Sequence, residues 1–486
     1  MLNLQTLPMS MQRIEAEESV LRQEQRVVVV SNRMPPLLMA SAEEEWRNLP
    51  VGGLVHALFP VLEDRGGLWM GWSGETVKDR ASAKVTTRNT SRIKLAGIDL
   101  IRREVNLFYN VFCNRTLWPL LHGFPAKTTI RHEAYQVYRR VNRRYAEALL
   151  PMLEKNDLVW VNDYHLIPLG YELRRLGWTG KVGFFLHTPF PPAEVFSVLP
   201  WADQLLESLF AYDLLGLQTT RQVHNLLDTL SMEFGGTLSD GVLTCGDQCL
   251  RAETYPVGID AEAFRAMATQ ARYSRADNFL RGLSREQVIV LGVDRLDYTK
   301  GLVQRLLSFE RLLERYPSLR RRVSMIQISA PSRSRIPEYV EESEQVDNLV
   351  GRINGHFSEA GWVPIQYLHR AYNRFELAAF YRAARVCLVM PLRDGMNLVA
   401  KEFVASQDEG DPGVLVLSKF CGAAETMTDA VIVNPYDIDS TTRAIYDAIQ
   451  MPRRERRRRW NSLMQGVQTF TAQAWYDSFL TDLAGE

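Results

Sequence analysis

The fold of this chain is decided by residues 288–301, which read VIVLGVDRLDYTKG. The run Val288–Val293 is apolar on both faces, and such strands belong to parallel sheets that helices cover on both sides. After Gly301 the spacing predicts an amphipathic helix, because apolar residues recur at steps of three and four until Pro317. Those residues are Leu302, Leu306, Phe309, Leu313 and Tyr316. The stretch predicts a strand, a polar loop and a helix, the repeating unit of an α/β protein.

The same pattern recurs on both sides of this stretch. Further β-branched runs are Val27–Val30, Leu158–Val161, Val182–Leu186, Val323–Ile328, Val386–Met390, Val414–Leu417 and Val431–Val433. A turn at Tyr255–Asp260, rich in Pro and Gly, separates an early group of runs from a late one. We therefore expect two doubly wound, Rossmann-like domains, 26–258 and 259–486, after a polar leader at 1–25. Ligands of such sheets bind beyond the carboxyl ends of the strands, so a central cleft is expected between the domains.

Composition excludes several classes of protein. Lys plus Arg and Asp plus Glu number 57 each, so no bulk charge draws the chain to nucleic acid or to anionic lipid. No apolar run approaches the roughly 20 residues of a membrane span, and the first 25 residues lack the pattern of a secretory signal. We expect a cytoplasmic protein with no membrane or nucleic-acid partner.

Cysteines are few and scattered. They are Cys113, Cys245, Cys249, Cys387 and Cys421. Cys245 and Cys249 are close in sequence, but no second pair or nearby histidine completes a zinc site. Reduced thiols of a cytoplasmic protein are the favoured interpretation.

Two polar loops carry the strongest chemical signals. In the first, Arg295 and Lys300 can reach a diphosphate at the start of the following helix; spacing alone equally allows a surface ion pair. The second loop, Pro391–Glu402, follows another apolar strand. Its glycine permits close approach of backbone, its helix start offers free N–H groups to phosphate, and Asp394 and Glu402 are suited to sugar and ribose hydroxyls.

Signals in the first half are weaker alone. The pair Gly52-Gly53 precedes a helical pattern, but most such pairs are turns. Asp163 and His187 each follow a strand, where a histidine is more often structural than functional. The chain has no G-x-G-x-x-G, G-x-S-x-G, H-E-x-x-H or Walker motif, which disfavours dinucleotide oxidoreductases, serine hydrolases, zinc proteases and P-loop enzymes. The arginine run 453–459 is interpreted as a solvated helix face rather than a polyanion site.

Taken together, these segments closely resemble trehalose-6-phosphate synthases, the retaining glycosyltransferases of family 20 with the two-domain GT-B fold. The matching text, in order, is Ser31-Asn32-Arg33, Gly52-Gly53-Leu54, Gly66-Gly67-Leu68-Trp69, Gly71-Trp72-Ser73-Gly74, Asp163-Tyr164-His165-Leu166, Phe184-Phe185-Leu186-His187, Pro189-Phe190-Pro191, Tyr212-Asp213-Leu214-Leu215-Gly216, Arg295–Leu302 and Arg393–Glu402. The resemblance extends over nearly the whole chain from about Val27.

The resemblance implies a site for glucose 6-phosphate in the N-terminal domain. The residues similar to those that bind the acceptor are Arg33, Tyr109, Trp118, Asp163 and Arg333. Of these, Arg33, with Tyr109 and Arg333 as partners, corresponds to the arginine that binds the phosphate, and Asp163 to the aspartate that contacts the sugar.

The resemblance also implies a donor site, mainly in the C-terminal domain, for UDP-glucose or another nucleotide-glucose. Its residues are Gly52, Gly53, His187, Arg295, Lys300, Tyr372, Asp394, Leu398, Val399, Ala400, Lys401 and Glu402. Here His187 resembles the histidine that contacts the donor glucose, which reverses the structural interpretation given above. Asp163, Arg295, Lys300 and Asp394 are the expected catalytic set. The last helix is expected to pack back on the N-terminal domain.

The chain departs from the family pattern at three places. Pro50-Val51 precedes the glycine pair where small residues are usual, after a loop that holds Glu43-Glu44-Glu45-Trp46. Asn162 stands where a histidine is common, and Ser334-Arg335 where a glycine and an acidic residue are frequent.

The mechanism that we favour needs no protein nucleophile, and in it cations and a helix start stabilise the leaving diphosphate. No acidic metal-binding motif is evident, so we expect no requirement for a metal or another cofactor. Three alternatives stay open. One is a sister glucosyltransferase that uses glycerol 3-phosphate, which Arg33, Tyr109 and Trp118 disfavour. The second is a regulatory protein without turnover, which the intact donor set disfavours. The third is a nucleic-acid-binding role, which rests on the arginine run alone. A homo-oligomer is possible on this sequence.

Overall fold

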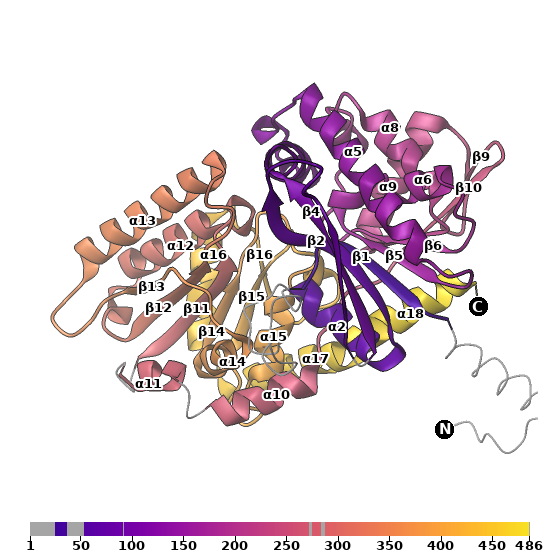
Figure 1. The fold of residues 1–486 in the computed structure, drawn as a ribbon. Helices are drawn as coiled ribbons and strands as arrows, with labels where there is room; N and C mark the ends of the chain where they lie inside the picture. Colours follow the sequence, from indigo (N-terminus) through magenta and orange to yellow (C-terminus); the bar gives the residue numbers. More distant parts are fainter. Residues whose placement is uncertain (1–24, 36–52, 91, 272–274, 283–286, 486) are drawn as a thin grey trace, which may run out of the picture.

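Figure 1 shows two halves, each a sheet with helices on both faces. The computed structural model describes residues 25–35, 53–90, 92–271, 275–282 and 287–485. Within these ranges the N-terminal sheet has the strand order β3-β4-β2-β1-β5-β6-β7-β10-β9-β8, and the C-terminal sheet has the order β13-β12-β11-β14-β15-β16. The prediction of two doubly wound α/β domains is therefore confirmed.

Most strands of the N-terminal sheet run parallel, and the exceptions lie at its two ends. Its strands are β1 Val27–Arg33, β2 Gly67–Val77, β3 Val85–Asn89, β4 Ile93–Ile101, β5 Leu158–Asn162, β6 Val182–Phe185, β7 Leu214–Leu217, β8 Thr237–Ser239, β9 Val242–Cys245 and β10 Gln248–Thr254. Its helices are α2 Gly53–Arg65, α3 Arg102–Glu104, the π-helix η4 Val105–Leu117, α4 Trp118–Leu121, α5 His132–Leu149, α6 Leu169–Arg175, α7 Ala193–Phe196, α8 Ala202–Glu207 and α9 Thr220–Phe234. Strand pairs β3–β4, β8–β9 and β9–β10 are antiparallel.

Every described pairing in the C-terminal sheet is parallel. Its strands are β11 Val288–Arg295, β12 Val323–Ala330, β13 Ile365–Leu368, β14 Val386–Val389, β15 Val414–Ser418 and β16 Val431–Val433. Its helices are α10 Ala261–Gln270, α11 Arg275–Gly282, the short 3₁₀ turn η10 Tyr298–Lys300, α12 Leu302–Arg315, α13 Pro337–Phe357, α14 Arg374–Ala383, α15 Leu398–Ser406, α16 Ile438–Gln450, α17 Arg453–Thr469 and α18 Ala472–Ala484.

All eight expected strands are present, and burial matches the apolar runs of most of them; β16, with Ile432 exposed, is the exception. Strand β2 was not among the expected strands; it begins with the stretch from Gly67 to Gly74. That stretch is rich in glycine, a composition that weakens strand propensity. One of these glycines, Gly71, lies where a Cβ atom would come within 2.6 Å of the backbone nitrogen of Met34, so close packing against β1 requires it.

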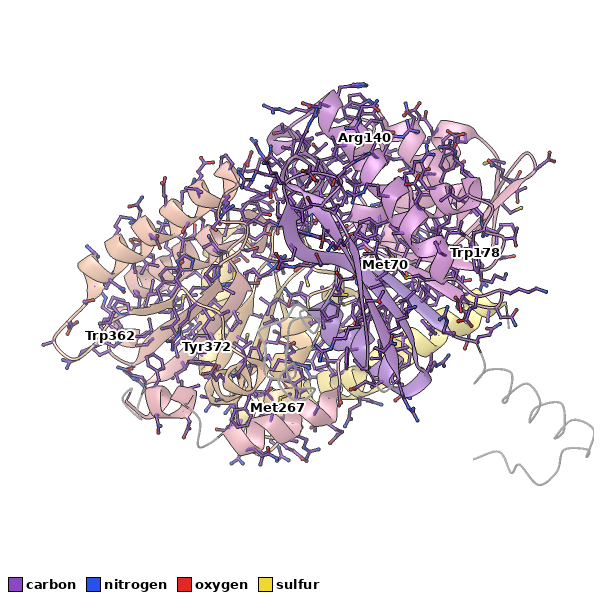
Figure 2. The ribbon with its side chains drawn as sticks, in the orientation of Figure 1. Met70, Arg140, Trp178, Met267, Trp362 and Tyr372 are labelled. Atoms are coloured by element: carbon purple, nitrogen blue, oxygen red, sulfur yellow. The ribbon has the colours of Figure 1, made fainter. Side chains whose placement is uncertain are left out.

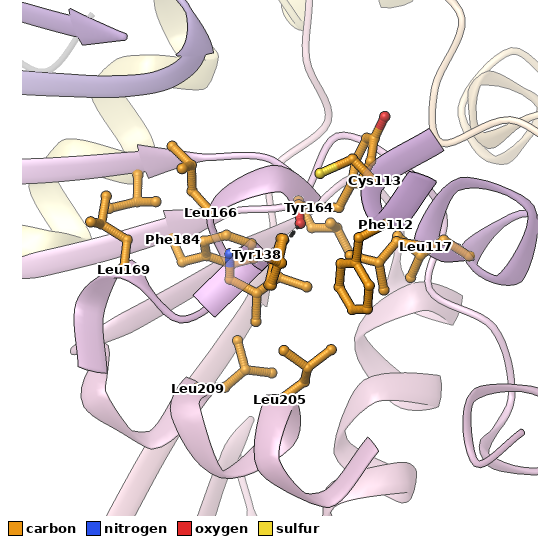
Figure 3. Close-up of a cluster of buried hydrophobic side chains, with 14 of the residues drawn as sticks. Phe112, Cys113, Leu117, Tyr138, Tyr164, Leu166, Leu169, Phe184, Leu205 and Leu209 are labelled. Carbon is orange, nitrogen blue, oxygen red and sulfur yellow. Dashed lines mark hydrogen bonds between the residues drawn. The ribbon is translucent and has the colours of Figure 1, made fainter. Parts of the chain in front are cut away.

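An aromatic core fixes the helices that carry the N-terminal site (Figure 3). The rings of Phe112 in η4 and Tyr138 in α5 lie 4.5 Å apart, and Tyr138 donates a hydrogen bond of 2.8 Å to the carbonyl of Tyr164. Both rings are fully buried. The core therefore joins η4 to the loop that follows β5.

The chain passes from one sheet to the other at the turn 255–260 and returns between α17 and α18. The two passages meet at a β-bridge between Ile259 and Thr471. Helix α18 then lies against the N-terminal sheet, as Figure 1 shows. Its Phe479 stacks on Trp160 of β5 with ring centroids 4.8 Å apart. The C-terminal end of the chain thus packs with the first sheet.

The carboxyl edges of the two sheets face each other. The loop after β14 approaches the loop after β6 so closely that a Cβ atom on Gly395 would lie 2.1 Å from the carbonyl oxygen of His187. Gln222 of α9 donates a hydrogen bond of 3.1 Å to the carbonyl of Gly395. The polar residues that follow the strands of both sheets are therefore gathered at one place.

Candidate active site

The two loops with the strongest sequence signals meet in a buried ion pair. Lys300, in η10 after β11, places its Nζ 2.5 Å from Oδ2 of Asp394, which follows β14. Asn397 also donates to that carboxylate oxygen, at 3.0 Å. Burial acts to lower the pKa of Lys300, but the carboxylates of Asp394, Asp294 and Asp297 together outweigh it and the pKa is raised. Burial likewise opposes the charge of Asp394, yet Lys300 holds the pKa of Asp394 below its usual value. Both groups are charged, and the loops are locked together.

Arg295 presents a second cation from the same strand end. Its guanidinium lies 5.5 Å from the ring centre of Trp118 and 3.8 Å from Oδ2 of Asp297, and its side chain is 46% exposed. Asp297 is fully buried and accepts hydrogen bonds from the backbone and hydroxyl groups of Thr299. These bonds shape the turn η10. Arg295 is therefore accessible, whereas the turn that carries Lys300 is fixed.

The start of α15 is a helix N-terminus next to the ion pair, which suits an anion, but the side chain of Lys401 is turned away to another partner. Asn397 caps the helix by accepting from the N–H of Ala400 at 3.3 Å, with a φ of 99°. Asn397 bonds both this amide and Asp394, so the helix start lies next to the Lys300–Asp394 pair. Lys401 is buried, and its Nζ donates to the carbonyl of Val257 at 2.6 Å. The side chain of Lys401 therefore holds the interdomain turn, and only its backbone belongs to the helix start.

Two other expected donor residues line the same half. Glu402 accepts a hydrogen bond of 2.9 Å from Tyr381, and burial raises its pKa. Tyr372, labelled in Figure 2, follows β13 and packs edge-on against Phe380 with ring centroids 5.2 Å apart. Of the glycine pair, Gly53 begins α2, and Gly52 lies outside the described residues, as does the loop with Glu43-Glu44-Glu45-Trp46.

On the N-terminal side, an arginine and two aromatic rings come together. Arg33 ends β1, and its guanidinium lies 5.4 Å from the ring centre of Trp72. The ring of Tyr109 in η4 lies 6.0 Å from that of Trp72. Gly74 leaves room for Arg33, because a Cβ atom there would come 2.8 Å from its guanidinium. Trp72 was not among the expected site residues, although the matched text Gly71-Trp72-Ser73-Gly74 contains it.

Arg333 reaches across from the C-terminal half. It has a left-handed φ of 49°, and its side chain is 8% exposed. Its guanidinium stacks 4.1 Å from the ring centre of Trp118 and donates to the hydroxyl of Tyr164 at 3.1 Å. It also contacts the hydroxyl of Tyr339. Trp118 is therefore in contact with both Arg295 and Arg333, which brings the two halves of the site together.

Asp163 and His187 lie side by side beyond β5 and β6. Asp163 adopts a φ of 76°, and its Oδ1 accepts from the N–H of His187 at 3.3 Å. Burial raises the pKa of Asp163 to about 6, although three backbone N–H groups and Arg333 act against it. Burial lowers the pKa of His187 to about 3. The neutral ring bonds Asn162 through Nε2 at 3.0 Å, and the neighbouring Asn162 amide donates to the carbonyl of Trp160. Asn162 thus fixes the orientation of His187.

The arginine run 453–459 differs from its predicted state. Arg456 is buried and donates to the carbonyl of Pro412 and to Asp411 at 2.6 Å. The prediction of a solvated face is wrong for this residue, because it closes the loop before β15. Arg458 and Arg459 pair with Glu455, and Arg458 also with Asp429. Three of the six arginines of the run are therefore paired with nearby acids in the described structure.

No helix in the described ranges is long and apolar enough to cross a bilayer.

Comparison with known proteins gives one consistent result. The model of glycosyltransferase family 20 matches residues 25–485. A trehalose-6-phosphate synthase of Sinorhizobium fredii is 40% identical over 460 residues, which cover 94% of this chain and 98% of the relative. The solved α,α-trehalose-phosphate synthase (UDP-forming) of Burkholderia xenovorans, in complex with glucose-6-phosphate, is 38% identical, with a TM-score of 0.89 and coverage of 94% and 99%.

A second solved structure is similar to the same extent. The Escherichia coli protein bound with UDP-2-fluoro glucose is 38% identical, with a TM-score of 0.88 and coverage of 95% of this chain and 99% of the other. Sequence, fold and length therefore agree. The chain belongs to glycosyltransferase family 20 and has the GT-B architecture of its solved members.

Proposed function

We propose that this chain is a retaining glucosyltransferase that forms α,α-trehalose 6-phosphate from UDP-glucose, or another nucleotide-glucose, and glucose 6-phosphate. One observation carries the proposal: Arg295 and Arg333, from two different loops, both lie against the ring of Trp118. Arg295 and Lys300 are suited to a leaving diphosphate, and Arg333 to the phosphate of an acceptor sugar. Two relatives of similar length and fold have glucose-6-phosphate or UDP-2-fluoro glucose bound.

The proposal assigns a role to each domain. Residues 26–258 hold the acceptor through Arg33, Tyr109, Trp118 and Asp163. Residues 259–486 hold the donor through Arg295, Lys300, Tyr372, Asp394 and the helix start from Leu398 to Glu402, with Gly52, Gly53 and His187 added from the first domain. Arg333 is the exception, since it belongs to the second domain in sequence and serves the acceptor.

In the proposed reaction, charge develops on the diphosphate as the glucosyl bond breaks. Lys300 is already paired with Asp394, so the cation is positioned before the substrate arrives and needs no reorganisation. The first turn of α15 adds N–H dipoles to the same place. The departing phosphate oxygen takes the proton of the attacking hydroxyl on the same face, which retains the configuration at the donor carbon.

The geometry of the two carboxylates supports a mechanism without a covalent intermediate. Oδ2 of Asp394 is already occupied by Lys300 and Asn397, which lowers its nucleophilicity. Asp163 is held by backbone N–H groups and neutralises near pH 6. Both residues are placed to orient hydroxyl groups, and neither to attack carbon.

An assay of the purified protein tests the reaction. The protein is incubated with UDP-, GDP- or ADP-glucose and with glucose 6-phosphate or glycerol 3-phosphate, and the product is identified by NMR. A 1,1-linked α,α-disaccharide phosphate is expected only with glucose 6-phosphate. A product from glycerol 3-phosphate alone, or simple hydrolysis of every donor, would contradict the proposal.

Mass spectrometry of the intact protein tests the mechanism separately. After rapid quench with donor, or with donor plus acceptor, the mass is expected to be that of the unmodified chain. A hexose adduct that maps to a peptide with Asp163 or Asp394 would replace the proposed mechanism by a double displacement, with the overall reaction unchanged.

A further inference from the structure

A second cleft lies beside the acceptor side of the site. It has a volume of about 1000 Å³ and is lined by the carboxyl ends of β2 and β4, by one face of η4 and by the start of α13. Five of its lining residues are cations: Lys78, Arg102, Arg103, Arg115 and Arg335. None of the described lining residues is acidic. The cleft is therefore a local region of positive charge on a chain whose net charge is zero.

Neighbouring acids neutralise two of these cations. Arg115 forms a two-pronged ion pair with Glu338 at 2.9 Å, and Arg103 pairs with Glu133 at the surface. In the part of the chain that the structure describes, no hydrogen bond or ion pair engages the side chains of Lys78, Arg102 and Arg335. All three are exposed. Their charges are left for a ligand, and a concave surface of one sign concentrates counter-ions.

The arginine run of α17 shows what a structural cluster looks like in the same molecule. There Glu455, Asp411 and Asp429 lie within 3.1 Å of the arginines they pair with. Arg454 and Arg457 of that run have no acidic partner among the described residues either, but they lie on an exposed helix face, whereas Lys78, Arg102 and Arg335 line one cleft. The cleft also combines residues of both domains, since Arg335 follows β12 and the others precede α5. An anion bound here would contact both domains.

Three elements of the cleft also carry acceptor-side residues. Helix η4 places Tyr109 beside Trp72 and presents Asn106 and Asn110 to the cleft. The loop after β12 carries Arg333 into the site and Arg335 to the cleft. Strand β2 brings Gly74 against Arg33, and its following residues line the cleft. A ligand that ties Arg335 to Lys78 and Arg102 would therefore restrain Arg333 against Trp118.

We propose that this cleft is a second anion site, which binds a small molecule with two or more phosphate groups and thereby tightens binding of the acceptor. Arginine forks match phosphate oxygens bidentately, and three cations at separate points of the rim suit more than one phosphate. The regulatory half of the proposal rests on the proposed function, whereas binding itself does not.

Isothermal titration with inorganic tripolyphosphate tests the site. UDP is first titrated alone and is then kept saturating, so that the probe cannot occupy the donor site. The wild type is compared with Lys78→Gln/Arg102→Gln/Arg335→Gln at constant ionic strength. A matched control, Lys155→Gln/Arg454→Gln/Arg457→Gln, removes the same three charges elsewhere; Lys155 precedes β5, and the two arginines lie on α17.

The wild type and the control are expected to bind the probe alike, and the cleft variant at least about tenfold more weakly. Tripolyphosphate should also lower the acceptor KM of the wild type and control by about twofold or more, and leave that of the cleft variant unchanged. Thermal unfolding checks that all three proteins are folded.

Absence of binding to the wild type, equal binding by the cleft variant, or equal loss in both variants would overturn the site. Binding without a change in acceptor KM would overturn the regulatory half. If UDP alone does not bind, the failure belongs to the proposed function, and the probe titration still decides the cleft.

Discussion

The proposed donor and acceptor sides of the cleft are built in opposite ways. On the proposed donor side, Arg295 and Lys300 lie at the end of β11. Asp394, the partner of Lys300, follows the neighbouring strand β14, and the two charged groups are 2.5 Å apart. On the acceptor side, Arg333 belongs to one sheet, whereas its partners Tyr164 and Trp118 belong to the other. The cations proposed for the donor therefore come together within one domain, although His187 is added from the other, whereas Arg333 reaches its proposed acceptor-side partners only where the domains meet. We expect the donor to bind first, since the cations proposed to bind it are in place without closure.

Of the changes proposed here, removal of the Lys300 side chain should have the largest effect on activity. Lys300→Ala takes away a positioned cation from the leaving diphosphate, and losses of one such preorganised donor are about 10²- to 10³-fold in kcat. It also leaves Asp394 buried without its partner. Steady-state kinetics should show the loss in kcat/KM for the donor, with circular dichroism as the check on folding. A loss confined to the acceptor KM would mean that Lys300 belongs to the other side.

Arg295→Ala should have the next largest effect. Charged hydrogen bonds are worth about 1.5–3 kcal/mol each, so kcat/KM should fall by about ten- to a hundredfold while the protein stays folded. Because the Arg295 side chain is half exposed, stability should change little. The surface variant Arg311→Ala, outside the cleft on α12, serves as the control. Normal kinetics in Arg295→Ala would remove it from the donor site.

Arg33→Ala and Arg333→Ala should each raise the KM for glucose 6-phosphate by about tenfold, the lower end of the range for a charged hydrogen bond. The donor KM should stay nearly constant. The two variants also differ in which contacts they remove. Arg333→Ala loses contacts to Tyr164 and Trp118 that join the two domains, whereas the described contacts of Arg33 lie within the first domain. Small-angle scattering with both ligands should therefore show a larger shift in Arg333→Ala. A donor KM that rises instead would reverse the two half-sites.

The same difference explains what could be predicted from the sequence. Arg295, Lys300 and Asp394 follow apolar strands within short loops, so their positions in the sequence alone point to the carboxyl edge of a sheet. The strand that begins at Val288 and the helix after Gly301 were predicted on the same local grounds and are confirmed. The positions of these residues can be predicted because each lies only a few residues after a strand that the sequence itself reveals.

Contacts between distant segments were not predictable in this way. Trp72 lies in a glycine-rich stretch that does not look like a strand, and its place beside Arg33 depends on the pairing of β1 with β2. The role of Asp297 as a buried partner of both Arg295 and Arg333 depends on the meeting of two loops. Lys401 was expected at the donor, but its side chain turns to Val257, 144 residues earlier in the chain. The roles of individual residues at the site stay predictions.

The smallest expected effect concerns the two carboxylates, which differ as the two sides do. Asp394 has Lys300 at contact, and its pKa is lowered; Asp163 has mainly backbone partners, and burial raises its pKa to about 6. A folded-state pKa above the usual value near 4 means that Asp163 contributes stability below pH 4, which is lost as the pH rises through 6. Ionised Asp163 therefore costs stability at neutral pH.

Asp163→Asn should accordingly be more stable than the wild type at pH 8, by about 1–3 kcal/mol, and by much less at pH 4. Asparagine tolerates the positive φ, and its amide can donate to the neutral Nδ1 of His165, 4.0 Å from the present carboxylate. Thermal unfolding at both pH values measures the difference, with Asp240→Asn, an exposed site at φ 48°, as the control for the backbone effect. Asp394→Asn should have the opposite effect and lower stability at pH 8, since it leaves the buried Lys300 without its carboxylate partner. If both variants shifted in the same direction, the contrast between a paired donor carboxylate and an unpaired acceptor carboxylate would be wrong.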